Sequence, residues 1–215
     1  MIWRCGSYSF DSRTPVIMGI LNVTPDSFSD GGSYASIDEA VAAGLQMIED
    51  GALIVDVGGE SIRPGADPVS EEEELKRVLE VVRRLADEDI CVSIDTRHAS
   101  VAKACVEAGA SIINDVTGFR DPEMVKVAAS CDAGLVVMHM KGDDPRTMQN
   151  EPEYTDVVDE VLTYLKDRAN QLEQAGISRD RICLDPGPGF GKTAKQTIQL
   201  MRNFQEFARL GYPLM

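Results

Sequence analysis

The sequence lacks the features that mark membrane and secreted proteins. No apolar run approaches the roughly 20 residues that a membrane-spanning helix needs, and the first residues, Met1-Ile-Trp-Arg-Cys-Gly6, carry no secretory pattern. The five cysteines are scattered and form no C-x-x-C spacing, so they indicate reduced thiols rather than disulfides or a zinc site. We therefore expect a soluble protein of a reducing compartment, the cytoplasm, with no membrane partner.

Basic residues are also scarce. Lysine and arginine number 21 against 36 aspartates and glutamates, which gives a net charge of −15 at pH 7. Such acidity argues against a nucleic-acid partner. It does not exclude an anionic substrate, because locally placed basic groups decide that contact.

What the sequence does contain is a regular alternation. Short apolar runs end in polar residues, and a helical pattern follows each run. The predicted strands are Val16–Leu21, Leu53–Val57, Cys91–Ile94, Ile112–Asn114, Gly134–Met138 and Ile182–Leu184. The predicted helices are Ile37–Asp50, Glu71–Glu88, Ala99–Ala108, Pro122–Ser130, Tyr154–Ala175 and Ala194–Arg209. Residues 2–14 are short, polar and turn-like and predict a hairpin or a plug before the first of these strands. Ser70 with Glu73 predicts a capping box.

This alternation predicts an α/β fold with a parallel sheet. Polar residues at every strand end favour a (β/α)8 TIM barrel over an open sheet. Eight units take about 250 residues, whereas this chain of 215 residues shows about six βα units, with a seventh strand starting at Pro213-Leu-Met215. We expect one domain, 1–215, that is incomplete at its C-terminus and has open edges with exposed apolar faces.

A barrel of this kind gathers its active site at the C-terminal ends of the strands. The residues at these ends are Asn22, Asp56, Asp95, Asn114, His139 and Asp185. Crowded acids raise one another's pKa unless a donor-rich ligand or a cation accepts them, and a basic heterocycle with several N–H groups would suit such a site. Asp95 could instead cap the next helix. His139 could be a general base, although we interpret it as a packed, hydrogen-bonded residue. His98, early in the third helix, is interpreted as structural or exposed.

The stretch Met18-Gly-Ile-Leu-Asn-Val-Thr-Pro-Asp-Ser-Phe-Ser-Asp-Gly-Gly32 begins as a buried strand and ends in hydroxyls, carboxylates and glycines. A solvent loop held by Asx and Ser/Thr turns would explain its composition. The stretch nevertheless resembles, over its whole length, the N-terminal signature of dihydropteroate synthase. Four further motifs match that family in the same order: Glu60-Ser-Ile-Arg-Pro-Gly65, Ser93-Ile-Asp-Thr96, Ile112-Ile-Asn-Asp-Val116 and Asp185-Pro-Gly-Pro-Gly-Phe-Gly-Lys-Thr193.

The resemblance implies a pterin pocket. Asp95, Asn114 and Asp185 match pterin-binding positions, Asp185 accepting two hydrogen bonds from the amino-pyrimidinone edge. Met138 matches a pocket wall. The floor of the pocket is assigned to Phe190 and Gly189, and Lys192 is assigned to the pterin carbonyl region. The ending Gly191-Lys-Thr193 imitates a nucleotide-binding P-loop, but the full pattern needs glycine where this chain has Pro186.

The resemblance also implies a diphosphate site. Asn22 matches a position that coordinates Mg²⁺ on the substrate diphosphate. Ser61, Arg63 and Pro64 match the anion-binding loop, in which Arg63 is a fixed cation; a surface Arg63 paired with Glu60 is the alternative. The family has Thr or Ser where this chain has Ile62, so the contact at that position is not carried over.

The implied reaction is the condensation of 6-hydroxymethyl-7,8-dihydropterin diphosphate with p-aminobenzoate, with Asp95, Arg63 and Asp185 as catalytic residues and Mg²⁺ as cofactor. The full-length protein is expected to be a homodimer. The family's Ser-Arg-Lys and Arg-x-His motifs fall beyond Met215, so we expect this chain alone to be inactive or very weak. The alternatives are a methyltetrahydrofolate-binding methyltransferase domain and a non-catalytic paralogue or fragment.

Overall fold

The structure is a computed structural model that describes residues 1–24, 33–60, 69–142, 147–148 and 153–215, without the side chains of 33–36. Six parallel strands form one sheet in the order β3-β4-β5-β6-β7-β8. Their bounds are β3 (Met18–Asn22), β4 (Ile54–Gly58), β5 (Cys91–Asp95), β6 (Ile112–Asp115), β7 (Gly134–Met138) and β8 (Ile182–Asp185). Each strand lies beside its neighbour in sequence, which is the arrangement of a TIM barrel.

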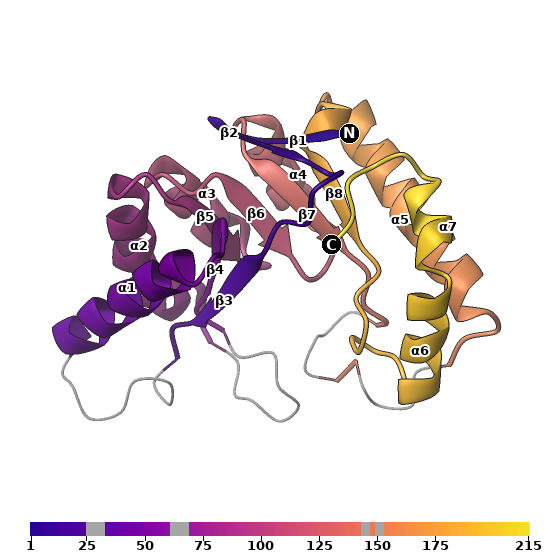
Figure 1. Ribbon diagram of the computed structural model, residues 1–215, viewed down its shortest axis with the longest axis horizontal. Coiled ribbons are helices and arrows are strands. Elements are labelled where there is room, and N and C mark those ends of the chain that lie inside the picture. Colours follow the sequence, from indigo (N-terminus) through magenta and orange to yellow (C-terminus); the bar gives the residue numbers. More distant parts are fainter. Residues whose placement is uncertain (25–32, 61–68, 143–146, 149–152) are drawn as a thin grey trace.

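Helices follow the strands in alternation (Figure 1). Their bounds are α1 (Ser33–Glu49), α2 (Glu71–Asp87), α3 (Ala99–Glu107), α4 (Pro122–Ala129), α5 (Val157–Gln174), α6 (Ala194–Arg202) and α7 (Phe204–Ala208), with a 3₁₀ turn η1 (Arg179–Arg181) before β8. The six predicted strand–helix units are therefore confirmed. None of the helices in the described part of the chain has the length and apolarity to cross a membrane.

The last predicted helix, Ala194–Arg209, is one element in the sequence pattern but two in the structure. It breaks at Asn203, whose Nδ2 donates to the carbonyl of Gln199 at 2.8 Å. Asparagine side chains compete in this way for helix backbone groups. The start of α6 carries a capping box between Thr193 and Gln196, which the sequence analysis missed. At α2, Ser70 accepts from the Glu73 amide as predicted, but the Glu73 carboxylate pairs with Arg77.

Successive residues of each strand face opposite sides of the sheet. Val55 and Val57 face the helices and belong to the large core between sheet and helices. Ile54 faces the barrel interior, in a second cluster with Trp3 of the N-terminal hairpin. This hairpin, β1 (Ile2–Cys5) and β2 (Tyr8–Asp11), covers one end of the sheet (Figure 1). The predicted hairpin is confirmed.

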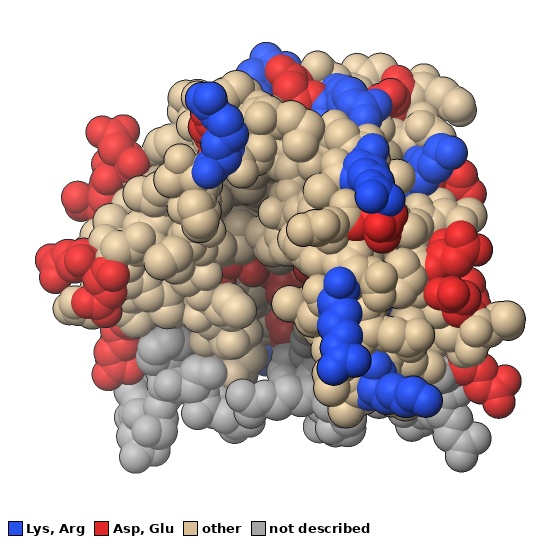
Figure 2. Space-filling view, turned by 45° about the vertical axis from the view of Figure 1, so that its right-hand side comes forward, with Lys and Arg blue, Asp and Glu red and all other residues tan. Residues whose placement is uncertain are grey.

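The sheet is open along one side. Strand β3 pairs only with β4 in the described part of the chain, and Ile17 and Ile20 beside this edge are 61% and 67% exposed. On the other side, Leu214 forms a parallel bridge to Leu184, the beginning of the predicted seventh strand. Figure 2 shows one face of the molecule, with a hollow near its centre and acidic side chains at the base of the hollow. The expected open edge and exposed apolar residues are thus confirmed.

Candidate functional site

The interior of the sheet changes from apolar to polar toward the strand ends. Asp95 and Asn114 are partners in the register between β5 and β6. Below them, Asp56 is paired in register with Ser93. Asn114 Nδ2 donates to Asp56 Oδ2 at 3.1 Å. The alternation of each strand therefore places the predicted polar residues on one interior surface, as sequence reasoning expected.

Gly58 brings Asn22 and Asp95 together. A Cβ at Gly58 would lie 3.4 Å from Asp95 Oδ2 and 3.8 Å from Asn22 Oδ1. The predicted magnesium position and the predicted pterin acid thus flank the same glycine. Asp95 does not cap the next helix: the Thr96 hydroxyl accepts from the His98 amide at that turn.

The ionised forms of the interior acids are destabilised by burial and by neighbouring charges. Burial, followed by the charge of Asp56, raises the pKa of Asp95 well above its ordinary value, and Glu74, Asp115 and Glu60 add to the effect. Burial likewise raises the pKa of Asp56, against the opposing effects of nearby Ser93 and Asn114. Groups of this kind favour a ligand or cation that brings hydrogen-bond donors or positive charge.

Asp185 lies at the end of β8, where the following loop bends back against β7. Its Oδ1 accepts from the Gly187 amide at 2.7 Å. Gly187 has a φ of 62°, and a Cβ there would lie 2.2 Å from the carbonyl oxygen of His139, so only glycine fits. Burial raises the pKa of Asp185 to about 6, against the opposing effects of the Gly187 amide and Lys192.

An apolar wall lies beside this acid. Met138 is the register partner of Asp185 and is buried in a cluster with Val116, Met140 and Met148, against which Phe190 packs. The structure therefore brings together the predicted wall residue Met138 and the predicted floor residue Phe190. Gly189, on the same loop, is exposed, and its amide donates to the Thr197 hydroxyl at 3.1 Å.

Lys192 is almost completely buried, at 3% exposure. Its Nζ donates to the carbonyls of His139, Gly187 and Phe190 at 2.9–3.0 Å and lies 2.9 Å from His139 Nδ1. Burial lowers the pKa of Lys192 to about 7, although Asp185 acts in the opposite direction. A ligand could reach this amine only by displacing one of its four protein contacts.

His139 is a packed, hydrogen-bonded residue, as the sequence analysis preferred. It is 5% exposed and makes an edge contact with the Tyr164 ring at a centroid distance of 4.9 Å. Burial and the charge of Lys192 lower the pKa of His139 to about 3, so the ring is neutral. Since Nδ1 faces the Lys192 amine, the ring proton belongs on Nε2. His98 is also structural, with Nδ1 at 2.5 Å from the buried carboxylate of Glu74.

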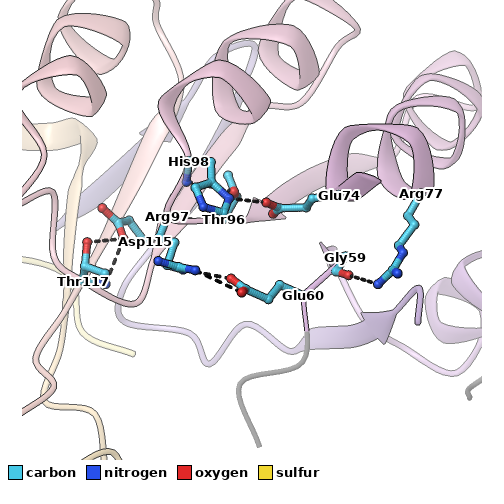
Figure 3. Close-up of polar contacts among 9 residues, drawn as sticks. All are labelled: Gly59, Glu60, Glu74, Arg77, Thr96, Arg97, His98, Asp115 and Thr117. Carbon is cyan, nitrogen blue, oxygen red and sulfur yellow. Dashed lines mark hydrogen bonds and ion pairs between the residues drawn. The ribbon is translucent and has the colours of Figure 1, made fainter. Parts of the chain in front are cut away.

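A bidentate ion pair joins the ends of β4 and β5. Arg97 Nε and Nη2 donate to the two carboxylate oxygens of Glu60 at 2.8 and 3.0 Å (Figure 3). Burial alone would raise the pKa of Glu60, but the hydrogen bonds and charge of Arg97 outweigh burial and leave that pKa below its ordinary value. Both Glu60 oxygens accept from Arg97. The alternative pairing of Glu60 with Arg63 stays a prediction, because Arg63 lies outside the described residues. Sequence reasoning missed this pair, although both residues directly follow neighbouring strands.

Arg97→Gln is expected to lower the free energy of unfolding at pH 7 by about 1–2 kcal/mol, because Glu60 loses its charged partner. The depressed pKa of Glu60 means that its stabilisation is present above its unfolded pKa of about 4.5 and is lost as the pH falls through the folded value. Urea unfolding at pH 7 and at about pH 4 measures the free energy of unfolding of both proteins. The difference between the wild type and Arg97→Gln should be smaller at the lower pH. Arg83→Gln, at an exposed pair with Glu80 on α2, is the control and should lower the free energy of unfolding less than Arg97→Gln does. An equal loss for Arg97→Gln at both pH values would contradict this prediction.

Three predicted site residues, Ser61, Arg63 and Pro64, lie outside the described residues, as does most of the signature stretch, 25–32. The diphosphate-binding role assigned to them stays a prediction. Within the described part of the chain, no group of three His, Cys, Asp or Glu side chains could hold a metal ion by itself. All five cysteines are free thiols, as predicted.

Fold and site together define a class: a (β/α)-barrel protein whose strand ends present acidic side chains on the interior surface beside an apolar wall. The chain belongs to the family described as pterin binding enzyme, whose model matches residues 18–215.

Named relatives narrow the comparison. A Halobacterium salinarum protein called a probable bifunctional folylpolyglutamate synthase/dihydropteroate synthase is 50% identical over 97% of this chain, which spans only 25% of that relative's length. The structure of Xanthomonas albilineans dihydropteroate synthase with 4-aminobenzoic acid has a TM-score of 0.91 and 42% identity, covering 99% of this chain and 76% of that one. Burkholderia cenocepacia dihydropteroate synthase complexed with 7,8-dihydropteroate has a TM-score of 0.86 and 40% identity, covering 96% of this chain and 70% of that one.

Proposed function

We propose that this chain carries the pterin-binding part of a dihydropteroate synthase, the transferase that joins 6-hydroxymethyl-7,8-dihydropterin diphosphate to p-aminobenzoate. The observation that carries the proposal is the set of interior acceptors at the strand ends, Asp95, Asn114 and Asp185, beside the apolar wall of Met138 and Phe190. The related proteins crystallised with 4-aminobenzoic acid and with 7,8-dihydropteroate support it.

The chemistry of the pocket suits a pterin. Its amino-pyrimidinone edge carries several N–H donors, and charge-assisted hydrogen bonds to Asp185 and Asp95 would offset the cost of holding these carboxylates at partly buried positions. The apolar side chains of Met138 and Phe190 would contact the face of the ring. We expect such a ligand to lower the pKa of both acids, because it favours their ionised forms.

In the proposed reaction, the amine nitrogen of p-aminobenzoate attacks the methylene carbon of the pterin. The carbon–oxygen bond to diphosphate breaks, diphosphate leaves with the electron pair, and the amine loses a proton. Asp95 and Asp185 would stabilise the positive charge that develops on the pterin-methyl group, and Arg63 would offset the charge of the leaving diphosphate.

Magnesium would act on the diphosphate. Asn22 offers one amide oxygen beside Asp95, which fits an ion that keeps several waters and is bound largely through substrate phosphates. Such an ion supplies charge neutralisation to the leaving group. Cytoplasmic location and a homodimer of the full-length protein stay predictions.

Calorimetry with 6-hydroxymethyl-7,8-dihydropterin diphosphate tests the proposal. We expect the 215-residue chain to bind it, and to bind it more tightly with Mg²⁺ than with a chelator. Binding of methyltetrahydrofolate but not of the diphosphate would favour the methyltransferase alternative. A chain that is folded by circular dichroism and monodisperse by light scattering, yet binds neither compound, would favour a non-catalytic protein.

A further inference from the structure

Asp56 makes an unusual contact for a buried acid. It lies on β4 and is 5% exposed. Its Oδ2 accepts from Asn114 Nδ2 on β6, at 3.1 Å. Since β5 lies between these two strands in the sheet, the hydrogen bond spans the barrel interior rather than joining neighbouring strands.

The rest of the Asp56 carboxylate is poorly satisfied. Its Oδ1 is buried and has no hydrogen-bond partner among the described residues, and the same holds for the hydroxyl oxygen of Ser93, its register partner. A buried carboxylate held only for structural reasons would be expected to have its acceptors filled. Ser93 lies close enough to act on the pKa of Asp56, but the hydrogen bond with defined geometry goes to Asn114, at 3.1 Å. Asn114 is the partner that also stands at the strand ends, so it is the residue through which Asp56 can act on a ligand.

The direction of that bond has a consequence for Asn114. An ionised carboxylate can only accept, so the amide must turn its NH₂ group toward Asp56. The amide oxygen lies on the other side of the same planar group and is left for a ligand at the strand ends. The pocket then presents acceptors at three positions: Asp95, Asn114 and Asp185.

We propose that Asp56 is a positioning residue, which holds the Asn114 amide with its oxygen toward the ligand and so makes the pocket prefer a heterocycle edge with N–H donors over one with carbonyl acceptors. The inference rests on the proposed function, because it takes Asn114 to meet the pterin. It assigns to Asp56 no contact with the ligand itself.

Two matched probes test this selectivity: 6-hydroxymethylpterin and the corresponding lumazine, in which a carbonyl acceptor replaces the exocyclic amino donor. Calorimetry is carried out at about pH 8, because a higher pH favours the ionised carboxylates. The wild-type chain should prefer the pterin at least about 30-fold. Asp56→Asn should narrow that preference by about 10-fold, because the Asn114 amide becomes free to turn its NH₂ group toward the lumazine carbonyl.

Asn114→Ala supplies the second side of a double-mutant cycle. In that background Asp56→Asn should leave the preference unchanged, since the residue through which it acts is gone. Asp115→Asn is the control: Asp115 is fully buried on the same strand and accepts from Thr117 and Phe119, so its loss should lower the melting temperature without changing the preference.

The positioning role would be overturned if Asp56→Asn weakened the binding of the pterin and of the lumazine equally. It would also be overturned if Asp56→Asn narrowed the preference for the pterin by the same factor in the wild-type and Asn114→Ala backgrounds. A wild-type chain that binds neither probe would overturn the proposed function, and the selectivity with it. The side-chain ¹⁵N signal of Asn114 would then still decide the positioning itself: a shift in Asp56→Asn but not in Asp115→Asn supports it, and an unchanged signal overturns it.

Discussion

Asp185→Asn is expected to weaken pterin binding at pH 7 by at least about 100-fold, because a neutral amide replaces a charge-assisted acceptor in a partly buried site. The fold should survive, since the asparagine oxygen can still accept from the Gly187 amide, as Asp185 Oδ1 does at 2.7 Å. Calorimetry with dihydropterin diphosphate measures the loss. Asp180→Asn, at an exposed pair with Arg4, makes the same change in net charge and should leave binding intact.

The same variant should be more stable than the wild type at neutral pH. The pKa of Asp185 is raised from 3.8 to about 6 in the folded chain, so between these values the folded state binds more protons than the unfolded state, and stability falls as the pH rises. Asp185→Asn removes this penalty. We expect a gain of about 1–2 kcal/mol at pH 7, less than the full shift implies, because Asp185 is partly exposed.

The role of Asp185 can be tested by the pH dependence of pterin affinity and of stability. Wild-type pterin affinity should fall as the pH drops through about 6, and the affinity of Asp185→Asn should stay flat over that range. Urea unfolding should show the stability gap between the two proteins closing toward about pH 4. A variant that loses both binding and stability at pH 7 would mean that Asp185 supports the fold rather than the ligand.

The fold could be predicted largely because its signals are local. Each strand is a short apolar run that ends in a polar residue, and a parallel sheet with one-step connections follows from the alternation. The same pattern predicts which polar residues face the barrel interior. Asn22, Asp95, Asn114 and Asp185 all stand where an apolar run stops, and the register places them on one surface.

What could not be predicted depends on side chains that meet from distant segments. The sequence shows that Glu60 and Arg97 follow neighbouring strands, but not that the guanidinium takes both carboxylate oxygens. It shows Lys192 in a glycine-rich loop, but not that the amine turns inward. The break between α6 and α7 falls at Asn203, whose side chain donates a hydrogen bond to the Gln199 carbonyl. The sequence pattern does not show this break, because it is helical on both sides of Asn203.

Removal of the buried amine of Lys192 is expected to lower both the free energy of unfolding and the affinity for the pterin. Lys192→Met keeps the apolar stem but removes the amine from the carbonyls of His139, Gly187 and Phe190. The Gly187 carbonyl keeps the Phe190 amide as a donor, at 3.1 Å, whereas the other two carbonyls lose the donor that the amine supplied. Unsatisfied buried acceptors cost about 1–3 kcal/mol each, reduced where the loop can relax toward water. We expect the free energy of unfolding at pH 7 to fall by about 2–3 kcal/mol, and pterin affinity to fall about 10-fold because the loop that carries Phe190 loosens beside Asp185.

The effect should depend on pH with a defined sign. The pKa of Lys192 is lowered from 10.5 to about 7 in the folded chain, so between these values the unfolded state binds more protons, and wild-type stability rises with pH. Lys192→Met lacks this gain, so the stability gap should widen by up to about 2 kcal/mol between pH 7 and pH 9. Lys195→Met, which removes an exposed lysine of α6, should show neither the loss nor the widening.

The same variant separates two roles for Lys192. The family resemblance places the amine against the pterin carbonyl region, whereas the structure turns it toward three loop carbonyls and His139 Nδ1. A ligand contact predicts a large loss of affinity with stability unchanged at both pH values. A loop-fixing role predicts a large loss of stability that grows with pH, with a smaller loss of affinity. Because both quantities come from the same two proteins, one set of unfolding and calorimetric curves decides between them.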